Sequence, residues 1–307
     1  MLQQTQVATA TPYYQRFLQH FPTLAELADA HVGEVMALWS GLGYYARARN
    51  LHACAQMVIQ HHGGHFPALP EQLAALPGIG PSTANSIATF CFGARAPILD
   101  GNVKRVLTRA FGIDGFPGNA AVEKQLWALA ETLMPAKHGD TYNQAQMDLG
   151  ATLCTRNKPR CGDCPLSEIC VAHIDGRQAE LPHRKPRREI PQRQVTLLIL
   201  RHGNRVLLEQ RPPVGIWGGL LSLPELPDGI SAEVFSQQRF ACEIYDVSSA
   251  PTRSHSFTHF HLQIQPLICA VTPRPRAMET GATWVALDAI NRTALPTPVK
   301  KLLSELV

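Results

Sequence analysis

The first half of the chain repeats its apolar positions with the period of amphipathic helices. Between residues 24 and 38, for example, the apolar side chains fall on roughly one helical face. Thr23 precedes this stretch and Glu26 lies in its first turn. Together they form a capping box, in which the side chain of each residue accepts a hydrogen bond from the backbone N–H of the other. Similar patterns predict helices over residues 46–60, 70–75, 81–92, 102–111, 121–133 and 141–153, after an apolar stretch over residues 7–21.

The pattern changes after about residue 171. Residues 171–194 are polar, are interrupted by three prolines and carry five arginines and lysines between residues 184 and 193, which is typical of an interdomain linker. From residue 195 the apolar period becomes that of strands, predicted over 195–200, 205–209, 259–271 and 283–286. A turn at 202–204 and a closing helix at 298–306 complete this part. The sequence therefore predicts a helical domain followed by a smaller α+β domain.

The composition of the chain excludes few classes of protein. The 307 residues suffice for two domains, and a net charge of +4 permits nucleic-acid binding without demanding it. No run reaches the roughly 18 apolar residues of a membrane span, and the first residues lack the features of a signal peptide. We therefore expect a cytoplasmic protein without membrane contact, whose eight cysteines stay reduced unless they bind metal.

A turn rich in Gly and Pro, Leu76-Pro77-Gly78-Ile79-Gly80-Pro81-Ser82-Thr83, separates two of the predicted helices. Such a turn can point backbone N–H groups outward and hold a phosphate together with the positive end of the next helix. Asp100 follows 17 residues after Thr83, where its carboxylate would lie beside a nucleic-acid backbone held in this way. The pattern indicates chemistry on a nucleotide, with a mere tight turn as the alternative.

Four cysteines follow the last predicted helix of the first domain with the spacing C-x6-C-x2-C-x5-C. They are Cys154, Cys161, Cys164 and Cys170. This spacing allows the four thiolates to converge on one centre, and a zinc ion or a cubane iron–sulfur cluster would satisfy them. The remaining four are scattered, and we expect each to be a small buried hydrophobic residue: Cys54, Cys91, Cys242 and Cys269.

The hairpin turn, residues 100–106 and the cysteine spacing together resemble the endonuclease III superfamily of DNA glycosylases. Within it the chain resembles the MutY-type adenine glycosylases, which act on adenine opposite 8-oxoguanine. The resemblance covers nearly the whole chain and implies a multidomain fold. A mainly α helix-hairpin-helix glycosylase core with an iron–sulfur loop is expected over residues 1–170, the basic linker over 171–193, and an α+β Nudix-like 8-oxoguanine-recognition domain over 194–307.

The same resemblance implies the cofactor and the partner. The family's cluster is 4Fe–4S, which decides against zinc for Cys154, Cys161, Cys164 and Cys170. The expected partner is double-stranded DNA that contains A:8-oxoguanine or A:G mispairs, bound by a monomer. Lyases of the superfamily carry a lysine at the position of Ser82, whose amine attacks the sugar. Because Ser82 cannot form an imine, we expect a monofunctional enzyme that uses water.

The resemblance also assigns roles to individual residues. Asp100 matches the ionised carboxylate that stabilises an oxocarbenium-like sugar, with Asn102 supporting it. Gln144 matches the contact with the adenine, which must be flipped out of the duplex. The expected DNA contacts are Gln4 and Thr5 beside the lesion, Leu42 and Tyr44 as the wedge on its other side, and Pro77, Gly78, Gly80 and Ser82 in the hairpin. Without the resemblance, residues 41–45 would be interpreted as a helix C-cap with a core tyrosine.

The C-terminal domain matches the family through residues 211–220. A Nudix hydrolase also needs a Glu-rich helix to hold Mg²⁺, and none follows Gly219, so we expect no pyrophosphatase activity. Phe257-Thr258-His259 matches the loop that recognises 8-oxoguanine, with Thr258 where serine is common. His255, His259 and His261 alternate without a nearby carboxylate or cysteine, so surface and loop positions are expected for them.

The family's general acid is a glutamate two residues before the position that matches Met1, so these 307 residues do not contain it. The first carboxylate, Glu26, is explained by the capping box. A non-catalytic protein that binds mismatched DNA is therefore the alternative to an enzyme. A lyase or endonuclease is a third interpretation, which Ser82 opposes.

We predict that a polypeptide of these 307 residues binds DNA but has little or no adenine-excising activity. General-acid catalysis contributes about 10²–10⁴-fold, and this contribution would be lost. Single-turnover excision on a duplex with an A:8-oxoguanine pair measures the effect, and robust strand scission after alkali would contradict it. An in-frame upstream Ser-Glu-Val would restore the interpretation as an active enzyme.

Overall fold

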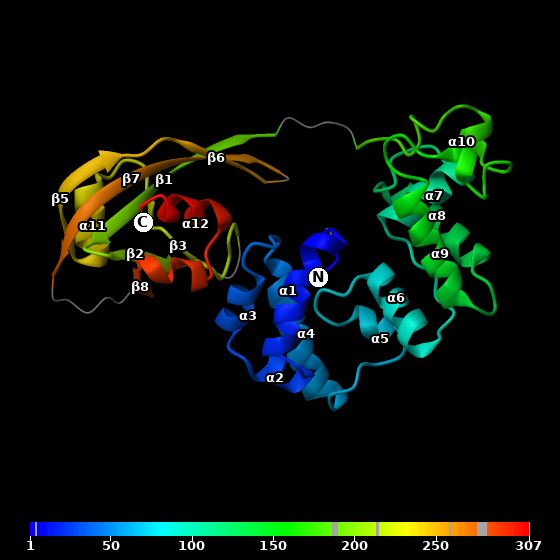
Figure 1. The fold of residues 1–307 in the computed structure, drawn as a ribbon, viewed down its shortest axis with the longest axis horizontal. Coiled ribbons are helices and arrows are strands. Elements are labelled where there is room, and N and C mark those ends of the chain that lie inside the picture. Colours follow the sequence, from blue (N-terminus) through cyan, green and yellow to red (C-terminus); the bar gives the residue numbers. More distant parts are fainter. Residues whose placement is uncertain (4, 186–189, 213–214, 258, 275–280, 307) are drawn as a thin grey trace. The chain divides into compact units, whose positions relative to one another are not determined.

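The structure is a computed structural model that describes residues 1–3, 5–185, 190–212, 215–257, 259–274 and 281–306 (Figure 1). Two predicted DNA-contact residues, Gln4 and Thr258, lie outside the described residues. The chain forms two compact units, one of Met1–Gln56 with Glu189–Val307 and the other of Met57–Arg188. The predicted class, helical first and α+β at the C-terminal end, is confirmed, whereas the domain bounds stay a prediction.

The first unit begins with the helices α1 (Val7–His20), α2 (Leu24–Asp29), α3 (Val32–Trp39) and the first part of α4 (Ala46–His62), whose last turns belong to the second unit. The capping box is confirmed, because the Glu26 N–H donates to Thr23 Oγ1 and the Thr23 N–H donates to Glu26 Oε2, both at 3.2 Å. Trp39 is almost fully buried and meets the edge of Phe17 at 6.3 Å between ring centroids. These aromatic side chains hold α1 against α3.

The rest of the first unit is an eight-stranded sheet with flanking helices. Its strands are β1 (Gln192–His202), β2 (Arg205–Gln210), β3 (Leu221–Ser222), β4 (Glu225–Leu226), β5 (Cys242–Ser249), β6 (Arg253–Ser256), β7 (His261–Pro273) and β8 (Ala282–Ala286). The order is β3-β2-β1-β7-β5, with β4 on β1, β6 on β7 and β8 on β2. Only β1 and β7 pair in parallel among the described strands, from Gln192↔His261 to Arg201↔Ala270.

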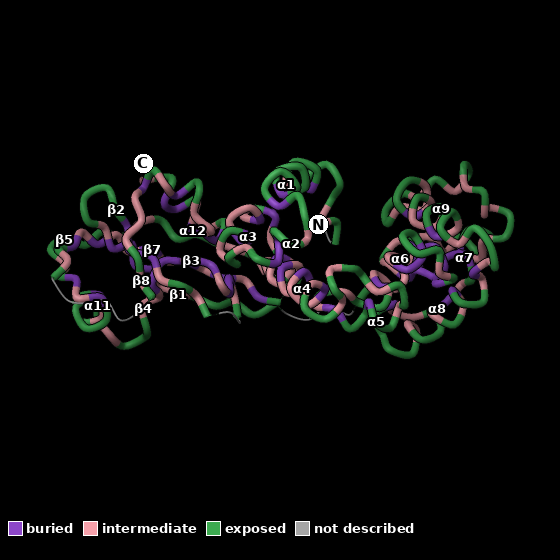
Figure 2. Tube along the Cα trace, turned by 90° about the horizontal axis from the view of Figure 1, so that it is seen from below, coloured by how far each residue is buried: buried purple, intermediate pink, exposed green. Residues whose placement is uncertain are grey.

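Helix α11 (Ala232–Phe240) packs against β5, and both elements were missing from the sequence prediction. The short helix η2 (Leu287–Arg292) and α12 (Thr297–Ser304) close the unit. Its core, marked in Figure 2 as buried, combines β1 and β7 with α11 through Leu198, Phe240 and Val271. The alternation of β5 is weak because most of its side chains are exposed, which explains why the pattern did not reveal it.

The isolated cysteines follow the expectation with one exception. Burial raises the pKa of Cys54, and it raises the pKa of Cys242 and Cys269 to about 11, as expected for thiols in an apolar core. Cys91 is exposed, so its predicted burial is wrong. It lies in the last turn of its helix, beyond the buried positions Ala84, Ala88 and Thr89.

The second unit contains the helices α5 (Pro70–Ala74), α6 (Pro81–Phe92), α7 (Gly101–Ala110), α8 (Ala120–Leu133) and α9 (Gly139–Thr152). Each begins and ends within two residues of its predicted bounds. A core of Leu99, Val103, Leu107, Ile113, Leu126 and Ala130 joins α7 to α8. The short helices η1 (Cys161–Asp163) and α10 (Val171–Ile174) follow, the second inside the stretch expected to be a linker.

Helices α7 and α9 approach each other most closely at Gly150. A Cβ atom at this position would lie 2.6 Å from Asn102 Cβ and 3.1 Å from Asn102 Cα. Both distances are shorter than a van der Waals contact, and one of them involves the backbone. Glycine at 150 therefore allows the first turn of α7, which carries Asn102, to pack directly on α9.

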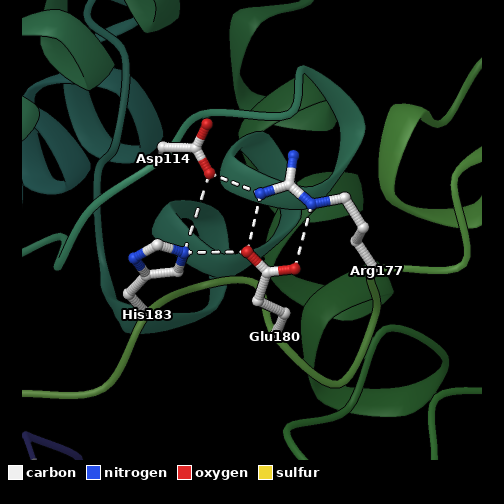
Figure 3. Close-up of polar contacts among 4 residues, drawn as sticks. All are labelled: Asp114, Arg177, Glu180 and His183. Carbon is white, nitrogen blue, oxygen red and sulfur yellow. Dashed lines mark hydrogen bonds and ion pairs between the residues drawn. The ribbon is translucent and has the colours of Figure 1, made fainter.

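A polar cluster joins the loop after α7 to the segment after α10 (Figure 3). Arg177 Nη2 donates to Asp114 Oδ1 at 2.5 Å and to Glu180 Oε1 at 2.7 Å, while its Nε donates to Glu180 Oε2 at 3.0 Å. His183 Nε2 lies 3.2 Å from Glu180 Oε1. The bonds from Arg177, followed by those from His183, lower the pKa of Glu180 from 4.5 to about 2.

We expect Gly150→Ala to lower the thermal unfolding temperature. Overpacking of this kind costs about 1–3 kcal/mol, more than the roughly 1 kcal/mol that alanine gains over glycine in a helix. Gly101→Ala in α7 is the matched control, because a Cβ atom at that position meets nothing within 4 Å. Equal unfolding temperatures for the two variants would contradict the close packing at Gly150.

The depressed pKa of Glu180 predicts a pH dependence of stability. Since the folded pKa lies below the unfolded one, the ion pair stabilises the fold above pH 4.5, and this contribution disappears as the pH falls from 4.5 toward 2. The stability difference between the parent protein and Glu180→Gln should shrink over that range in urea titrations. A stability difference that stays constant between pH 4.5 and 2 would contradict this contribution of the ion pair.

Candidate active site

The Gly- and Pro-rich turn links α5 to α6, as predicted. Leu76 is buried and anchors the turn, and its carbonyl accepts the Ile79 N–H at 3.2 Å. Gly78 has φ +76°, in the left-handed region where a side chain would be strained. Gly78 and Gly80 are exposed, and Gly80 is the N-cap of α6. The turn therefore presents its backbone to solvent at the positive end of a twelve-residue helix.

Ser82 connects this turn to the segment that carries Asp100. Its Oγ accepts the backbone N–H of Leu99 at 3.1 Å, across 17 residues of sequence. Ser82 is thus a structural partner of the residue directly before Asp100. The sequence did not predict this contact, since nothing in the local pattern relates positions 82 and 99.

Asp100 is the N-cap of α7. Its Oδ1 accepts the Val103 N–H at 2.7 Å, and its side chain is half-buried. This bond fixes the carboxylate at the positive end of the helix, where the helix dipole favours a negative charge. An ionised carboxylate held in this way can stabilise a positive charge that develops on a nearby sugar.

Asn102 does not contact Asp100 through its own carboxamide oxygen. That oxygen accepts from Arg105 Nη2 at 2.9 Å, and the same guanidinium donates to Gly150 O at 2.6 Å and Cys154 O at 2.7 Å. Burial lowers the pKa of Arg105. Arg105 therefore links the first turn of α7 to the end of α9 and to the start of the cysteine loop.

Gln144 is exposed on α9 and lines a shallow hollow of about 430 Å³ together with Phe90 and Asp148. Its Nε2 donates to Asp148 Oδ1 at 2.9 Å. The hollow offers an aromatic face beside polar atoms, which suits a flat heterocyclic base. Gln144 and Asp100 are on separate elements, so their relation depends on how α9 is held against the chain before α7.

The four cysteines of the loop lie near one another and are partly buried. The pKa of Cys161 is raised first by burial and then by the negative charges of Cys154, Cys170 and Cys164. Such mutual influence requires the four thiols to be close together in space. The loop can therefore present all four sulfur atoms to one centre.

Arg109, on α7, is buried beneath this loop. Its Nη1 lies 3.4 Å from Cys154 Sγ and donates to Thr155 O at 2.7 Å, while its Nε donates to Leu181 O at 2.8 Å. Arg105 and Arg109 were not predicted from the sequence as functional residues. The available signal was two arginines four residues apart, directly after Asp100 and on one side of a helix.

In the first unit, Arg47 brings together two of the predicted DNA-contact segments. Its guanidinium donates to Met1 O at 2.8 Å and to Gln3 O, and also to Leu42 O and Gly43 O, each at 3.3 Å. The start of the chain, which includes the half-buried Thr5, is thereby tied to the Gly-rich turn. Arg47 was not singled out by its sequence context.

Leu42 and Tyr44 occupy different environments in this turn. Leu42 is buried, whereas Tyr44 is 52% exposed and has φ +49°. The interpretation of Tyr44 as a core tyrosine is therefore wrong, because the left-handed backbone at residues 43 and 44 turns the ring outward. Only Tyr44 of this pair presents its side chain to solvent.

An open cavity of about 1180 Å³ lies beside Tyr44 within the first unit. Its aromatic and basic lining includes Tyr44, Arg47, Arg49, Arg193, Trp217, His255, Phe257 and His259. Burial and the charge of Lys301 lower the pKa of His255. Aromatic faces and guanidinium groups together can stack on bases and attract phosphates.

Among the described residues, one group of three potential metal-ligand atoms lies within 4.8 Å of one another, and it belongs to Asp114, Glu180 and His183. Arg177 already binds both carboxylates there, so a cation would have to displace it. Within the described part of the chain, histidines 255, 259 and 261 form no such group. The expected surface and loop positions are wrong for His255 and His261, which are half-buried on β6 and β7, whereas His259 is exposed outside both strands.

Comparisons with known proteins cover both parts of the chain. Residues 1–132 match the HhH-GPD superfamily of base excision DNA repair proteins, and residues 195–305 match the NUDIX domain. No helix among the described residues has the length and apolar character to cross a membrane.

Adenine DNA glycosylases are similar over almost the whole chain. The protein of that name from Buchnera aphidicola subsp. Acyrthosiphon pisum is 34% identical over 99% of this chain and 87% of its own length. The human adenine DNA glycosylase is 32% identical over 98% of this chain and 66% of its own length. The solved structure of a thermostable thymine-DNA glycosylase is similar over 57% of this chain and 80% of that one, with 28% identity and a TM-score of 0.51. The chain therefore belongs to the adenine DNA glycosylases, base excision repair enzymes of the HhH-GPD superfamily with a C-terminal NUDIX domain.

Proposed function

We propose that the protein is a monofunctional glycosylase, which hydrolyses the N-glycosidic bond of adenine mispaired with 8-oxoguanine or guanine in double-stranded DNA. The observation that carries this proposal is the hydrogen bond between Ser82 and Leu99. A hydroxyl replaces the amine that a lyase needs, and it is engaged in holding the chain next to Asp100. Water is then the nucleophile at the sugar.

In this proposal the hairpin binds the DNA backbone, and Asp100 provides the negative charge that the reaction needs. The exposed backbone of Gly78 and Gly80 would bind a phosphate, with Pro77 in the turn beside it and Ser82 at the start of the helix behind it. Asp100 would stay ionised and stabilise the oxocarbenium-like sugar as the base departs. Asn102 would support it through the first turn of α7, to which Arg105 ties its side chain.

The flipped adenine would lie at the hollow of Gln144, whose carboxamide can both donate to and accept from the edge of a base. Tyr44 is the exposed aromatic side chain suited to enter the base stack as a wedge. Gln4 and Thr5 remain the proposed contacts beside the lesion, and Leu42 remains a proposed part of the wedge with Tyr44. The cavity beside Tyr44 would take the opposite strand, with residues 257–259, including Thr258, at the 8-oxoguanine.

The cysteine loop fits a 4Fe–4S cluster held by Cys154, Cys161, Cys164 and Cys170. Four sulfurs around a single zinc ion at about 2.3 Å would lie about 3.8 Å apart. No three described cysteine sulfurs lie within 4.8 Å of one another, which favours the larger cubane. When bound, the cluster would fix the loop as a rigid surface, and Arg109 would donate toward the sulfur of Cys154.

We expect Asp100→Asn to reduce single-turnover excision by about 10²–10³-fold, as is typical when one charge-stabilising group is removed. The substitution keeps the N-cap acceptor to Val103, so stability should change little. The measurement is made on the protein expressed from its full reading frame, with a duplex containing an A:8-oxoguanine pair. Asp175→Asn, at an exposed aspartate of the same unit, should retain the parent rate.

Binding assays separate this proposal from its alternative. A parent protein expressed from its full reading frame that binds the mispaired duplex tightly but releases no adenine would support a non-catalytic DNA-binding protein instead. Borohydride trapping of a covalent complex with DNA would revive the lyase interpretation. Excision without trapping is the expected result for a monofunctional enzyme.

We expect Cys164→Ser to lose bound iron and the visible absorption of an iron–sulfur cluster. Cys91→Ser changes the exposed cysteine outside the set and should retain about four irons per chain, the content of one 4Fe–4S cluster. Metal analysis of both purified proteins checks this prediction. Stoichiometric zinc in the parent protein would overturn the assignment.

A further inference from the structure

The chain that leads into Asp100 is buried without belonging to a helix or a strand. Residues 93–100 have no regular secondary structure, yet Ala96, Ile98 and Leu99 are each at most 5% exposed. Backbone polar groups that are buried in this way need hydrogen-bond partners, because water cannot reach them. In a sheet the neighbouring strand would supply these partners.

Side chains replace the missing strand. Thr89 Oγ1 donates to Ala96 O at 2.8 Å, and Asn85 Nδ2 donates to Pro97 O at 2.8 Å, both from α6. Asn143, on α9, makes two bonds: its Nδ2 donates to Ala96 O at 2.9 Å and its Oδ1 accepts the Ile98 N–H at 3.3 Å. The Leu99 N–H donates to Ser82 Oγ. Side chains therefore bind backbone groups of four consecutive residues, 96–99.

Asn143 is the member of this set that connects two parts of the proposed site. It is 1% exposed, so its carboxamide is fixed in the interior. The carboxamide donates to one backbone group of the segment and accepts from another, as a neighbouring strand would. The next residue along α9 is Gln144, on the exposed side of the helix. The position of α9 and the position of the chain before Asp100 are therefore set by the same side chain.

We propose that Asn143 is a positioning residue for adenine excision, which holds Asp100 in register with the base-contacting face of α9. This inference rests on the proposed function, since it assigns the carboxylate and Gln144 to the reaction. Asn143 touches neither DNA nor the sugar. It acts through the segment 96–100, and Thr89 assists by sharing the carbonyl of Ala96.

The expected consequence is a loss in the chemical step rather than in binding. A shift of about 1 Å in a reacting group can cost on the order of 10²-fold in rate. Asn143→Leu, similar in volume but without hydrogen bonds, should slow single-turnover excision of adenine opposite 8-oxoguanine by about 10- to 100-fold. The dissociation constant for a duplex with 2′-fluoro-deoxyadenosine, which resists cleavage, should stay within about twofold of the parent value, since ground-state contacts are kept.

Two sets of controls keep a structural defect apart from a positioning defect. Asn119→Ala removes a side-chain acceptor from the Ala121 N–H at the N-cap of α8, far along the chain from the segment 96–100. It should lower stability and leave the rate unchanged. Should Asn143→Leu fail to fold, Thr89→Val and Thr89→Ser decide the matter: the first deletes the hydroxyl and should slow excision, and the second keeps it and should restore the rate.

Amide hydrogen exchange gives a readout that does not depend on catalysis. Asn143→Leu should accelerate exchange at Ile98 and Leu99, whereas Asn119→Ala should not. Unchanged exchange, a rate loss in Asn119→Ala as large as in Asn143→Leu, or equal rates for Thr89→Val and Thr89→Ser would each overturn the proposal. The rates are measured, as for Asp100→Asn, on the protein expressed from its full reading frame. A parent protein of that kind that excises no adenine would overturn the proposed function and the catalytic part of this inference together, while exchange would still decide whether the segment is held.

Discussion

Buried peptide groups must be hydrogen-bonded, and the candidate active site is built around that requirement. The chain between α6 and α7 crosses the interior of the second unit without a neighbouring strand, so side chains take the strand's place. Ser82, Asn85 and Thr89 lie on one face of α6 and supply three of the bonds, and Asn143 supplies the rest. An unmade bond at such a position costs about 1–3 kcal/mol, enough to make each partner matter.

The same requirement explains the use of arginine in the irregular parts of the molecule. Arg47 and Arg109 each direct several N–H groups at backbone carbonyls of loops, and Arg105 binds the carbonyl of Cys154 in a loop and that of Gly150 near the end of α9. The planar guanidinium suits this task because it offers five donors in a fixed geometry. One side chain can thus hold two segments, as Arg109 does for the start of the cysteine loop and the carbonyl of Leu181.

Close packing adds a second constraint at the start of α7. Gly150 lets α9 meet Asn102 at backbone distance, so the first turn of α7 is confined from the side as well as from the chain before it. Asp100 then closes this turn as its N-cap. The proposed role of Asp100 requires its carboxylate to be held in one position, and close packing and hydrogen bonds together hold it there.

The sequence by itself determined the helices of the second unit, the capping box at Thr23, the hairpin turn and the four-cysteine loop. These features depend on local periodicity, capping chemistry and short-range spacing, all of which are written in neighbouring residues. Strand β5 and α11 escaped prediction because β5 is an edge strand with mostly exposed side chains. The exposure of Cys91 escaped it as well, since its place in the last turn of a helix decides it. The partners of Ser82, Asn143, Arg47 and Arg109 were decided only by the tertiary structure. Each of these side chains binds backbone groups between 17 and 72 residues away or at the far end of a turn, and no local pattern encodes which segments the fold brings into reach.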